Sequence, residues 1–240
     1  MKHISAPDSQ TAALETARIV TDSIAINPQA VLGLATGNTM RPVYRALIDT
    51  AQQRAVSFKN VTSFNLDEYL GLPADHPALF ARYMMDNLMR HIDMDKNRFH
   101  IPCGHTEDPT RTAQDYEAAI AAAGGIDLQL LGVGTNGHIG FNEPGSPRDS
   151  RTRVVKLSEQ TRRDNFGAIT GDGIPERAIS MGLATIVSAR SVILLATGAS
   201  KTEAVAQILK GQNNPAWPCS YLSSHSDFTL ITDSDARGEA

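Results

Sequence analysis

Short runs of apolar residues recur along the chain, and segments with helical spacing of apolar residues separate them. The apolar runs lie at residues 31–36, 61–72, 126–131, 191–196 and 228–232. Runs of this length that are rich in Val, Ile and Leu are typical of strands buried on both faces of a sheet. The pattern therefore predicts several buried strands that are far apart in the sequence.

The intervening segments show the 3.6-residue period of amphipathic helices. In residues 9–26, Ala13, Ala17, Val20 and Ile24 fall on one face of such a helix. Further helices are predicted at 41–54, 78–92, 109–123 and 197–209. Strands that alternate with helices favour an α/β fold with a parallel sheet.

No internal repeat or linker interrupts the alternation, so we expect a single domain over residues 1–240. Residues 145–177 break the pattern, because they are rich in Gly, Pro, Arg, Asp and Ser and show weak periodicity. A polar stretch of this length inside a compact domain is often a binding loop, and we interpret it as a candidate lid.

Three of the predicted strands end in residues that carry chemistry. The run 31–36 leads into a Thr-Gly-x-Thr turn, the run 61–72 holds adjacent acids, and the run 126–131 leads into a glycine-rich loop with an imidazole and a carboxylate. The carboxyl ends of parallel strands share one edge of the sheet, where open α/β folds bind ligands. We therefore predict that the three loops meet in one site.

Each of these features also has a plain structural interpretation. Thr39 is suited to cap the helix that follows it, and Asp67 and Glu68 would fit a solvated turn. Lys201 lies in the predicted first turn of a helix, where a cation is unfavourable unless an anion compensates it. The expected convergence of the loops favours the site interpretation for all of them together.

Composition narrows the classes of function. The chain has 240 residues, 41% of them apolar and 20% charged, with a net charge of −4, and it has no basic stripe of the kind that binds nucleic acid. Cys103 and Cys219 stand far apart, which indicates neither a disulfide framework nor a zinc site. No signal segment or membrane-length apolar run is evident, so we expect a cytoplasmic protein without nucleic-acid or membrane partners.

Several segments resemble one known family. SFNLDEYLGLP and LGVGTNGHIGFNEPGSP are similar to the two signature segments of glucosamine-6-phosphate deaminases. LGLATGNT, LLATGASKTEA and SYLSSH resemble further segments of that family in the same order and spacing. The resemblance implies a Rossmann-like three-layer sandwich, with a mostly parallel central sheet between helix layers. It also implies deamination of glucosamine 6-phosphate to fructose 6-phosphate and ammonium, in amino-sugar catabolism, without a metal or an organic cofactor.

The resemblance also implies catalytic roles. Asp67 resembles the base that moves a proton between C2 and C1 of the opened sugar, which a carboxylate can take and return. His138 resembles the group that opens the pyranose ring. An imidazole suits this role because it titrates in a suitable range. Glu143 resembles its orienting partner, and Asn136 would add hydrogen bonds.

The phosphate of the sugar would bind at the other strand ends. The residues that resemble the family's phosphate cradle are Thr36, Gly37, Asn38, Thr39 and Lys201. The turn offers backbone N–H groups and hydroxyls at a helix N-terminus, which favours an anion. Phosphate contacts far from the reacting carbons supply binding energy that positions those carbons.

The chain departs from the family pattern at three places. Asn136 stands where the family often has Asp, and Gly167 falls near the position of an arginine that grips phosphate in well-known members. Arg163 and Arg151 are candidates to replace that arginine. An allosteric lysine of some members would fall near Val155, so we expect no activation by N-acetylglucosamine 6-phosphate. Members range from monomers to hexamers, so the sequence leaves a homo-oligomer open.

Three alternative functions stay open on the sequence alone. Galactosamine-6-phosphate deaminase/isomerase is closest, because no motif reports on the sugar's C4 hydroxyl, although FNLDEYLGL and GHIGFNEPG are nearer the glucosamine pattern. A 6-phosphogluconolactonase shares the fold, but it typically carries Asp-Glu-Arg where this chain has Tyr69. A sugar-phosphate sensor without catalysis would not need Asp67, His138 and Glu143 together.

Overall fold

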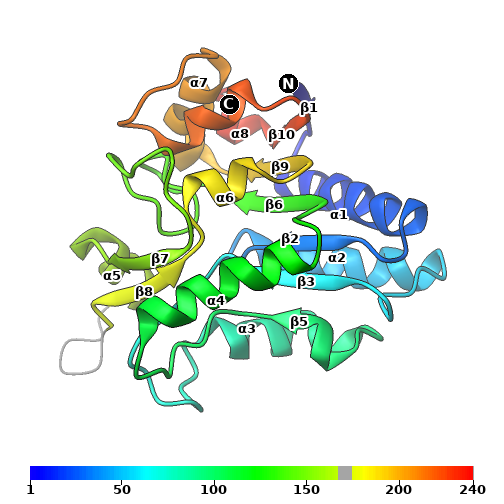
Figure 1. Ribbon diagram of the computed structural model, residues 1–240. Helices are drawn as coiled ribbons and strands as arrows, with labels where there is room; N and C mark the ends of the chain where they lie inside the picture. The colour runs from blue at the N-terminus through cyan, green and yellow to red at the C-terminus, as the bar shows by residue number, and fades with distance from the viewer. Residues whose placement is uncertain (167–174, 240) are drawn as a thin grey trace.

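The central sheet has seven parallel strands in a computed structural model that describes residues 1–166 and 175–239. Its strand order is β1-β10-β9-β6-β2-β3-β5, and every adjacent pair is parallel (Figure 1). The strands are β1 (Lys2–Ser5), β2 (Val31–Leu34), β3 (Thr62–Asn65), β5 (Phe99–His100), β6 (Leu128–Gly132), β9 (Ser191–Ala196) and β10 (Phe228–Thr232). The predicted α/β fold with a mostly parallel central sheet is confirmed.

Helices that connect the central strands cover both faces of this sheet. The α-helices of the described residues are α1 (Ser9–Ile26), α2 (Met40–Gln53), α3 (Phe80–Asn87), α4 (Pro109–Ala122), α5 (Glu159–Phe166), α6 (Leu183–Val187), α7 (Thr202–Leu209) and α8 (Ser234–Arg237). Of these, α5 lies beyond the central sheet, and α8 follows the last strand. Connections between parallel strands are right-handed, so this strand order sends α1, α2 and α3 to one face and α4 and α6 to the other. The result is the three-layer sandwich that the sequence led us to expect.

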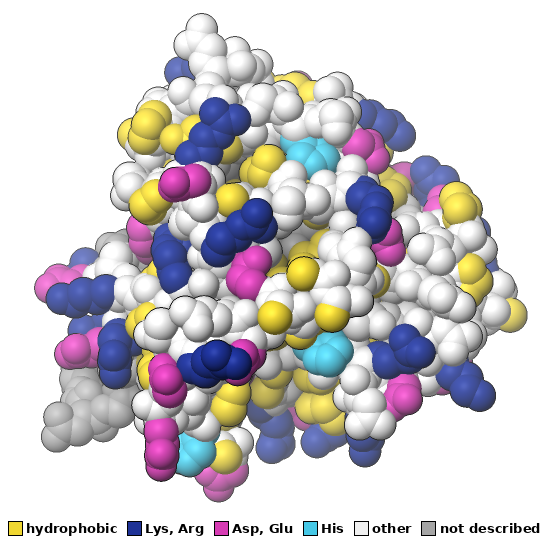
Figure 2. All heavy atoms as spheres, in the orientation of Figure 1, with side chains coloured by type: hydrophobic (Ala, Val, Ile, Leu, Met, Phe, Trp, Pro, Cys, Tyr) yellow, Lys and Arg dark blue, Asp and Glu magenta, His cyan; other side chains and the backbone are white. Residues whose placement is uncertain are grey.

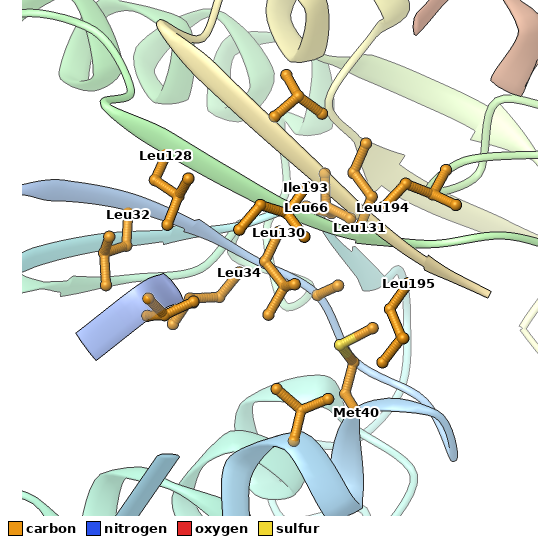
Figure 3. Close-up of a cluster of buried hydrophobic side chains, with 14 of the residues drawn as sticks. Leu32, Leu34, Met40, Leu66, Leu128, Leu130, Leu131, Ile193, Leu194 and Leu195 are labelled. Atoms are coloured by element: carbon orange, nitrogen blue, oxygen red, sulfur yellow. The ribbon is translucent and has the colours of Figure 1, made fainter. Parts of the chain in front are cut away.

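Leucines from the middle strands form the centre of the core. Figure 3 shows side chains of β2, β6 and β9 in contact beside Met40 of α2. Leu130, Leu131 and Leu194 are each no more than 1% exposed. Burial of a leucine side chain contributes roughly 1.5–3 kcal/mol, so these strands fix the sheet edge to which the functional loops attach.

Helix boundaries follow from local capping. Asp8 accepts a hydrogen bond from the Thr11 N–H at 2.7 Å and starts α1 where the sequence predicts it. Asp108 caps α4 in the same way, with Pro109 in the first turn. Gly124 then follows α4 with a positive φ of 87°, a conformation that favours glycine.

The single strand predicted over residues 61–72 is wrong. The chain forms β3 and then β4 (Asp67–Tyr69), which leaves the central sheet and joins a three-stranded sheet ordered β4-β8-β7. Strands β7 (Arg153–Lys156) and β8 (Arg177–Ser180) complete this second sheet, which is antiparallel. Leu66 divides β3 from β4, because its N–H bonds to Leu34 and its carbonyl accepts from the N–H of Met181.

Two predicted helices are also divided. The segment 78–92 forms α3 and then a short 3₁₀ helix, η1 (Met89–His91), because Leu88 leaves the helical conformation with φ −140°. The segment 197–209 begins as a 3₁₀ turn, η3 (Ala199–Lys201), before α7. Two more 3₁₀ helices are η2 (Lys96–Arg98) and η4 (Pro218–Ser224).

The candidate lid at 145–177 falls partly outside the described residues, which exclude 167–174. Its described part is not irregular, since it contains β7 and α5. Figure 1 shows β7, β8 and α5 beyond one end of the central strands, on the side where β6 ends. Movement of this segment over a ligand stays a prediction.

Candidate active site

A pocket of about 310 Å³ lies at the carboxyl ends of the central strands. Its walls come from the ends of β2 and β9, from β4 and from the loop after β6. The lining residues singled out from the sequence are Thr36, Gly37, Asn38, Thr39, Asp67, His138 and Lys201. The three predicted loops therefore meet, and Asp67 and His138 face the same pocket. This volume suits a small ligand such as a hexose phosphate.

Asp67 forms a buried part of the pocket wall. It lies on β4 opposite Ser180 of β8 and is only 5% exposed. The backbone of Gly140 comes so close that a Cβ there would be 3.4 Å from Asp67 Oδ2. Burial, with a smaller contribution from the charge of Glu68, raises the pKa of Asp67 to about 8. A carboxyl group with this pKa can both take and return a proton near neutral pH.

The adjacent acid has a different task. The Glu68 carboxylate accepts hydrogen bonds from the N–H groups of Phe80 at 3.0 Å and Ala81 at 2.8 Å, at the start of α3. It also accepts from the N–H of Tyr69 at 2.8 Å. Glu68 therefore caps α3 and fixes Phe80, whose ring packs 4.6 Å from that of Tyr69. In the sequence only the family resemblance separates the two acids, whereas in the structure the pairing of β4 with β8 leaves Asp67 in the pocket wall.

His138 is oriented directly by Asn136. The Nδ1 atom of His138 lies 2.7 Å from Oδ1 of Asn136, and the Nδ2 group of Asn136 donates to Glu143 at 2.8 Å. Because the amide nitrogen faces the carboxylate, the amide oxygen must accept from the imidazole Nδ1–H. This fixes the neutral tautomer with Nε2 as the acceptor. The resemblance makes Glu143 the direct orienting partner of His138. In the structure, Asn136 lies between the two and hydrogen-bonds to both.

Glu143 is the last residue of the hydrogen-bond series that starts at His138 and passes through Asn136. Its carboxylate lies 3.8 Å from His138 Nδ1 and accepts from the hydroxyls of Ser158, at 3.2 Å, and Thr161. Burial alone would raise the pKa of Glu143, but these hydrogen bonds, that of Asn136 and the nearby imidazole hold it below its usual value. Sequence reasoning missed Ser158 and Thr161, although a Ser directly before a helix is a recognisable capping signal.

The turn after β2 is built to present donors to the pocket. Gly37 has φ 108°, which an L side chain rarely adopts, and it directs the chain from β2 into α2. Thr39 precedes α2 but makes no side-chain capping bond, contrary to the plain structural interpretation of this residue. The first two N–H groups of α2, those of Met40 and Arg41, donate to the carbonyls of Gly37 and Asn38. Donors for an anion at this helix N-terminus must therefore come from residues 36–39, which line the pocket.

Lys201 reaches the pocket from the turn after β9. Gly198 begins this turn with φ 85°, and its N–H donates to both carboxylate oxygens of Asp233 at 3.0 Å. Asp233 also accepts from the N–H of Ala236 and so caps α8. Sequence reasoning missed Asp233, because its partner lies 35 residues away.

The candidate replacements for the family arginine lie elsewhere. Gly167 is outside the described residues. The guanidinium groups of Arg151 and Arg163 are each 3.7 Å from a glutamate, Glu117 and Glu159 respectively. Neither arginine is among the described residues that line the pocket.

A late segment of the chain supports the His138 loop. The N–H of Cys219 donates to the carbonyl of Gly137 at 2.9 Å, and the N–H of Gly145 donates to the carbonyl of Pro215 at 2.8 Å. A Cβ on Gly137 would come within 2.6 Å of the Trp217 ring. This segment, residues 215–219, therefore holds the loop at two points and was not predicted from the sequence.

We expect Gly134→Ala to damage the site more than the fold. A Cβ at residue 134 would lie 2.2 Å from two atoms of the His138 ring, so the imidazole must move. The expected result is a loss in kcat/KM of about 100-fold, since misplacing a catalytic group by an ångström can cost this much. Steady-state kinetics and thermal unfolding would measure the two effects.

Gly132→Ala is the matched comparison, because Gly132 also lines the pocket but its Cβ would meet only the flexible end of Met40, at 3.5 Å. It should keep activity within a few-fold of the unsubstituted protein. Equal activity of the two alanine variants would show that room for the imidazole is not the reason for glycine at position 134.

In the part of the chain that the structure describes, no three His, Cys, Asp or Glu side chains are grouped as metal ligands would be. None of the described helices is long and apolar enough to cross a membrane. On the face shown in Figure 2, lysine and arginine side chains are spread among acidic ones.

Together, the fold and the pocket define a class. A parallel α/β sheet, a turn suited to an anion at a helix N-terminus, and a buried carboxyl group and an imidazole in one pocket are features of an α/β enzyme that binds an anionic ligand and transfers protons. The model of the family described as glucosamine-6-phosphate isomerases/6-phosphogluconolactonase matches residues 7–231. The chain belongs to this family.

Within this family, the chain is similar to curated relatives and a solved structure that are described as glucosamine-6-phosphate deaminases. The chain is 45% identical to a glucosamine-6-phosphate deaminase of Rhodopirellula baltica, over 96% of this chain and 92% of the relative. It is 46% identical to glucosamine-6-phosphate deaminase 1 of Bacillus subtilis, over 92% and 91%. A solved structure described as a monomeric glucosamine-6-phosphate deaminase matches with a TM-score of 0.96 and 43% identity, and 100% of both chains is covered. A 6-phosphogluconolactonase from Trypanosoma cruzi shares the fold, with a TM-score of 0.79 and 20% identity.

Proposed function

We propose that this protein is a glucosamine-6-phosphate deaminase, which converts glucosamine 6-phosphate and water to fructose 6-phosphate and ammonium. The observation that carries the proposal is the common pocket of Asp67 and His138, with an anion-binding turn and Lys201 in the same wall. Relatives of 42–46% identity that bear this name support it. Solved 6-phosphogluconolactonases of 18–21% identity indicate the fold alone.

In the first step, His138 opens the pyranose. Because its Nδ1–H is directed to Asn136, Nε2 is the atom that we assign to the sugar. It takes the proton of the C1 hydroxyl and passes a proton to the ring oxygen, as the C1–O5 bond breaks and the C1 aldehyde forms. Glu143 stabilises the charged imidazole through Asn136 and by its own proximity.

In the second step, Asp67 in its carboxylate form removes the C2 proton. The electron pair moves to the C1–C2 bond while the aldehyde oxygen takes a proton from the C2 ammonium group, which forms an enolamine. Asp67 then returns its proton to C1, which leaves a protonated imine at C2, and water hydrolyses this imine to fructose 6-phosphate and ammonium. The raised pKa of Asp67 supports this role, because the carboxylate is a stronger base than an exposed aspartate.

The phosphate supplies affinity at a distance from this chemistry. We assign it to Thr36, Gly37, Asn38, Thr39 and Lys201, which line the end of the pocket formed by the β2 and β9 turns. Interactions with a group that does not react fix C1 and C2 against Asp67 and His138. Homo-oligomerisation and a cytoplasmic location remain predictions of the sequence.

The test is to incubate the protein separately with glucosamine 6-phosphate, galactosamine 6-phosphate and 6-phosphogluconolactone. Ammonium release and lactone hydrolysis are measured for each. We expect ammonium from glucosamine 6-phosphate with the highest kcat/KM. Preference for the C4 epimer, or hydrolysis of the lactone in place of deamination, would replace this proposal with one of its alternatives.

A further inference from the structure

The pocket has little positive charge for the ligand we assign to it. Among the lining residues that the structure describes, Lys201 is the only lysine or arginine. A phosphate monoester carries about −1.5 to −2 charges at neutral pH. The N-terminus of α2 contributes a partial charge of roughly +0.5. Lysine and helix together balance about 1.5 of these charges, so the fully ionised phosphate keeps about half a charge unbalanced.

Arg41 lies close to the phosphate end of the pocket but outside its wall. It is the second residue of α2, directly after the turn that ends at Thr39. Side chains of a helix lean toward its N-terminus, so Arg41 leans back toward this turn. Its side chain is exposed, and no carboxylate of the described residues is within ion-pair distance of it.

Tyr83 connects Arg41 to the turn itself. The guanidinium carbon of Arg41 lies 5.3 Å from the centroid of the Tyr83 ring, a cation–π distance. The hydroxyl of the same tyrosine donates to the carbonyl of Gly37 at 2.7 Å, and Gly37 lines the pocket. One aromatic ring thus holds the guanidinium on one side and the phosphate turn on the other.

We propose that Arg41 is a second cationic ligand of the sugar phosphate and reaches it across the Tyr83 ring. This inference rests on the proposed function, since it concerns the phosphate of the same substrate. Guanidinium suits the task because its planar N–H fork can bind two phosphate oxygens, whereas the Lys201 ammonium acts as a point charge. Neither Arg151 nor Arg163 is then required at this end of the pocket.

The test compares Arg41→Ala with Arg45→Ala. Arg45 lies one turn further along the same face of α2 and is also exposed, which makes it a matched control for the charge of the helix. KM and kcat for glucosamine 6-phosphate are measured at low salt. The dissociation constant of inorganic phosphate is measured by calorimetry, so phosphate affinity is known even without turnover. Lys201→Ala serves as a positive control.

We expect Arg41→Ala to raise KM and the phosphate dissociation constant about tenfold or more, with kcat within about twofold, because a charge-assisted hydrogen bond is lost. The KM and the phosphate dissociation constant of Arg41→Lys should lie between those of the unsubstituted protein and Arg41→Ala. Arg45→Ala should change neither constant by more than about twofold. Equal effects of the two alanine variants, or none, would overturn the inference. Failure of the unsubstituted protein to release ammonium would instead overturn the proposed function, while phosphate calorimetry would still decide the role of Arg41.

Discussion

Asp67→Asn is expected to lower kcat for glucosamine 6-phosphate by about 10²–10⁴-fold, the range that general acid–base catalysis contributes. Asparagine keeps the shape of the side chain in its buried position on β4 but cannot carry a proton. The phosphate contacts remain, so the dissociation constant of the substrate should change by less than about threefold. Ammonium release and calorimetric binding measure the two quantities.

Asp86→Asn is a suitable control, because Asp86 is an exposed acid on α3 that pairs with Arg82 and Arg90 outside the pocket. Its kcat should stay within twofold of the unsubstituted protein. Turnover by Asp67→Asn at the normal rate would exclude Asp67 as the proton carrier. A parallel loss of binding would mean that the residue mainly shapes the pocket.

The same substitution should stabilise the fold at high pH. The folded-state pKa of Asp67 is raised from 3.8 to about 8, so the folded state loses stability as pH rises from the unfolded value toward 8. Asparagine has no proton to lose. The difference in free energy of unfolding between Asp67→Asn and the unsubstituted protein should therefore grow in favour of the variant by more than about 1 kcal/mol between pH 5 and pH 8. Urea unfolding at both pH values gives this excess, and one that does not change would contradict the raised pKa.

His138→Gln is expected to slow ring opening more than proton transfer. Glutamine can hydrogen-bond to the sugar but cannot accept and deliver a proton, so kcat/KM for the pyranose should fall by about 100-fold. An analogue that lacks the C4 and C5 hydroxyls cannot form a furanose or pyranose ring. With this analogue the same variant should lose less than about tenfold.

His91→Gln provides the comparison, because His91 is exposed in η1 and does not line the pocket among the described residues. It should not change the ratio of activities toward the cyclic substrate and the open analogue. If His138→Gln lowers both activities equally, His138 does not act in ring opening and its role must lie in a later step.

Much of the central sheet could be predicted from the sequence because its signals are local. The strand at 228–232 and the helix at 9–26 have the predicted boundaries, set by an apolar run in one case and by the Asp8 cap in the other. The convergence of the loops followed from parallel pairing alone. Lys2–Ser5 and Phe99–His100 were missed because both strands are short edge strands with little apolar signal.

The second sheet could not be predicted, since β4 pairs with β8 across more than 100 residues of the chain. Asp67 pairs with Ser180, and this contact both ends the central strand and turns the carboxyl group into the pocket. The family resemblance singles out Asp67, but neither the capping role of Glu68 nor the raised pKa of Asp67 is visible in the sequence. These properties depend on burial that only tertiary structure creates.

The proposed reaction requires one hexose phosphate to contact all three loops at once. The most direct measurement is a crystal structure of the Asp67→Asn variant with glucosamine 6-phosphate bound. We predict the phosphate at residues 36–39 and Lys201, C1 and C2 beside residue 67, and the ring oxygen within hydrogen-bond distance of His138. A sugar phosphate bound in this pocket with C2 turned away from residue 67, or bound outside the pocket, would contradict the account.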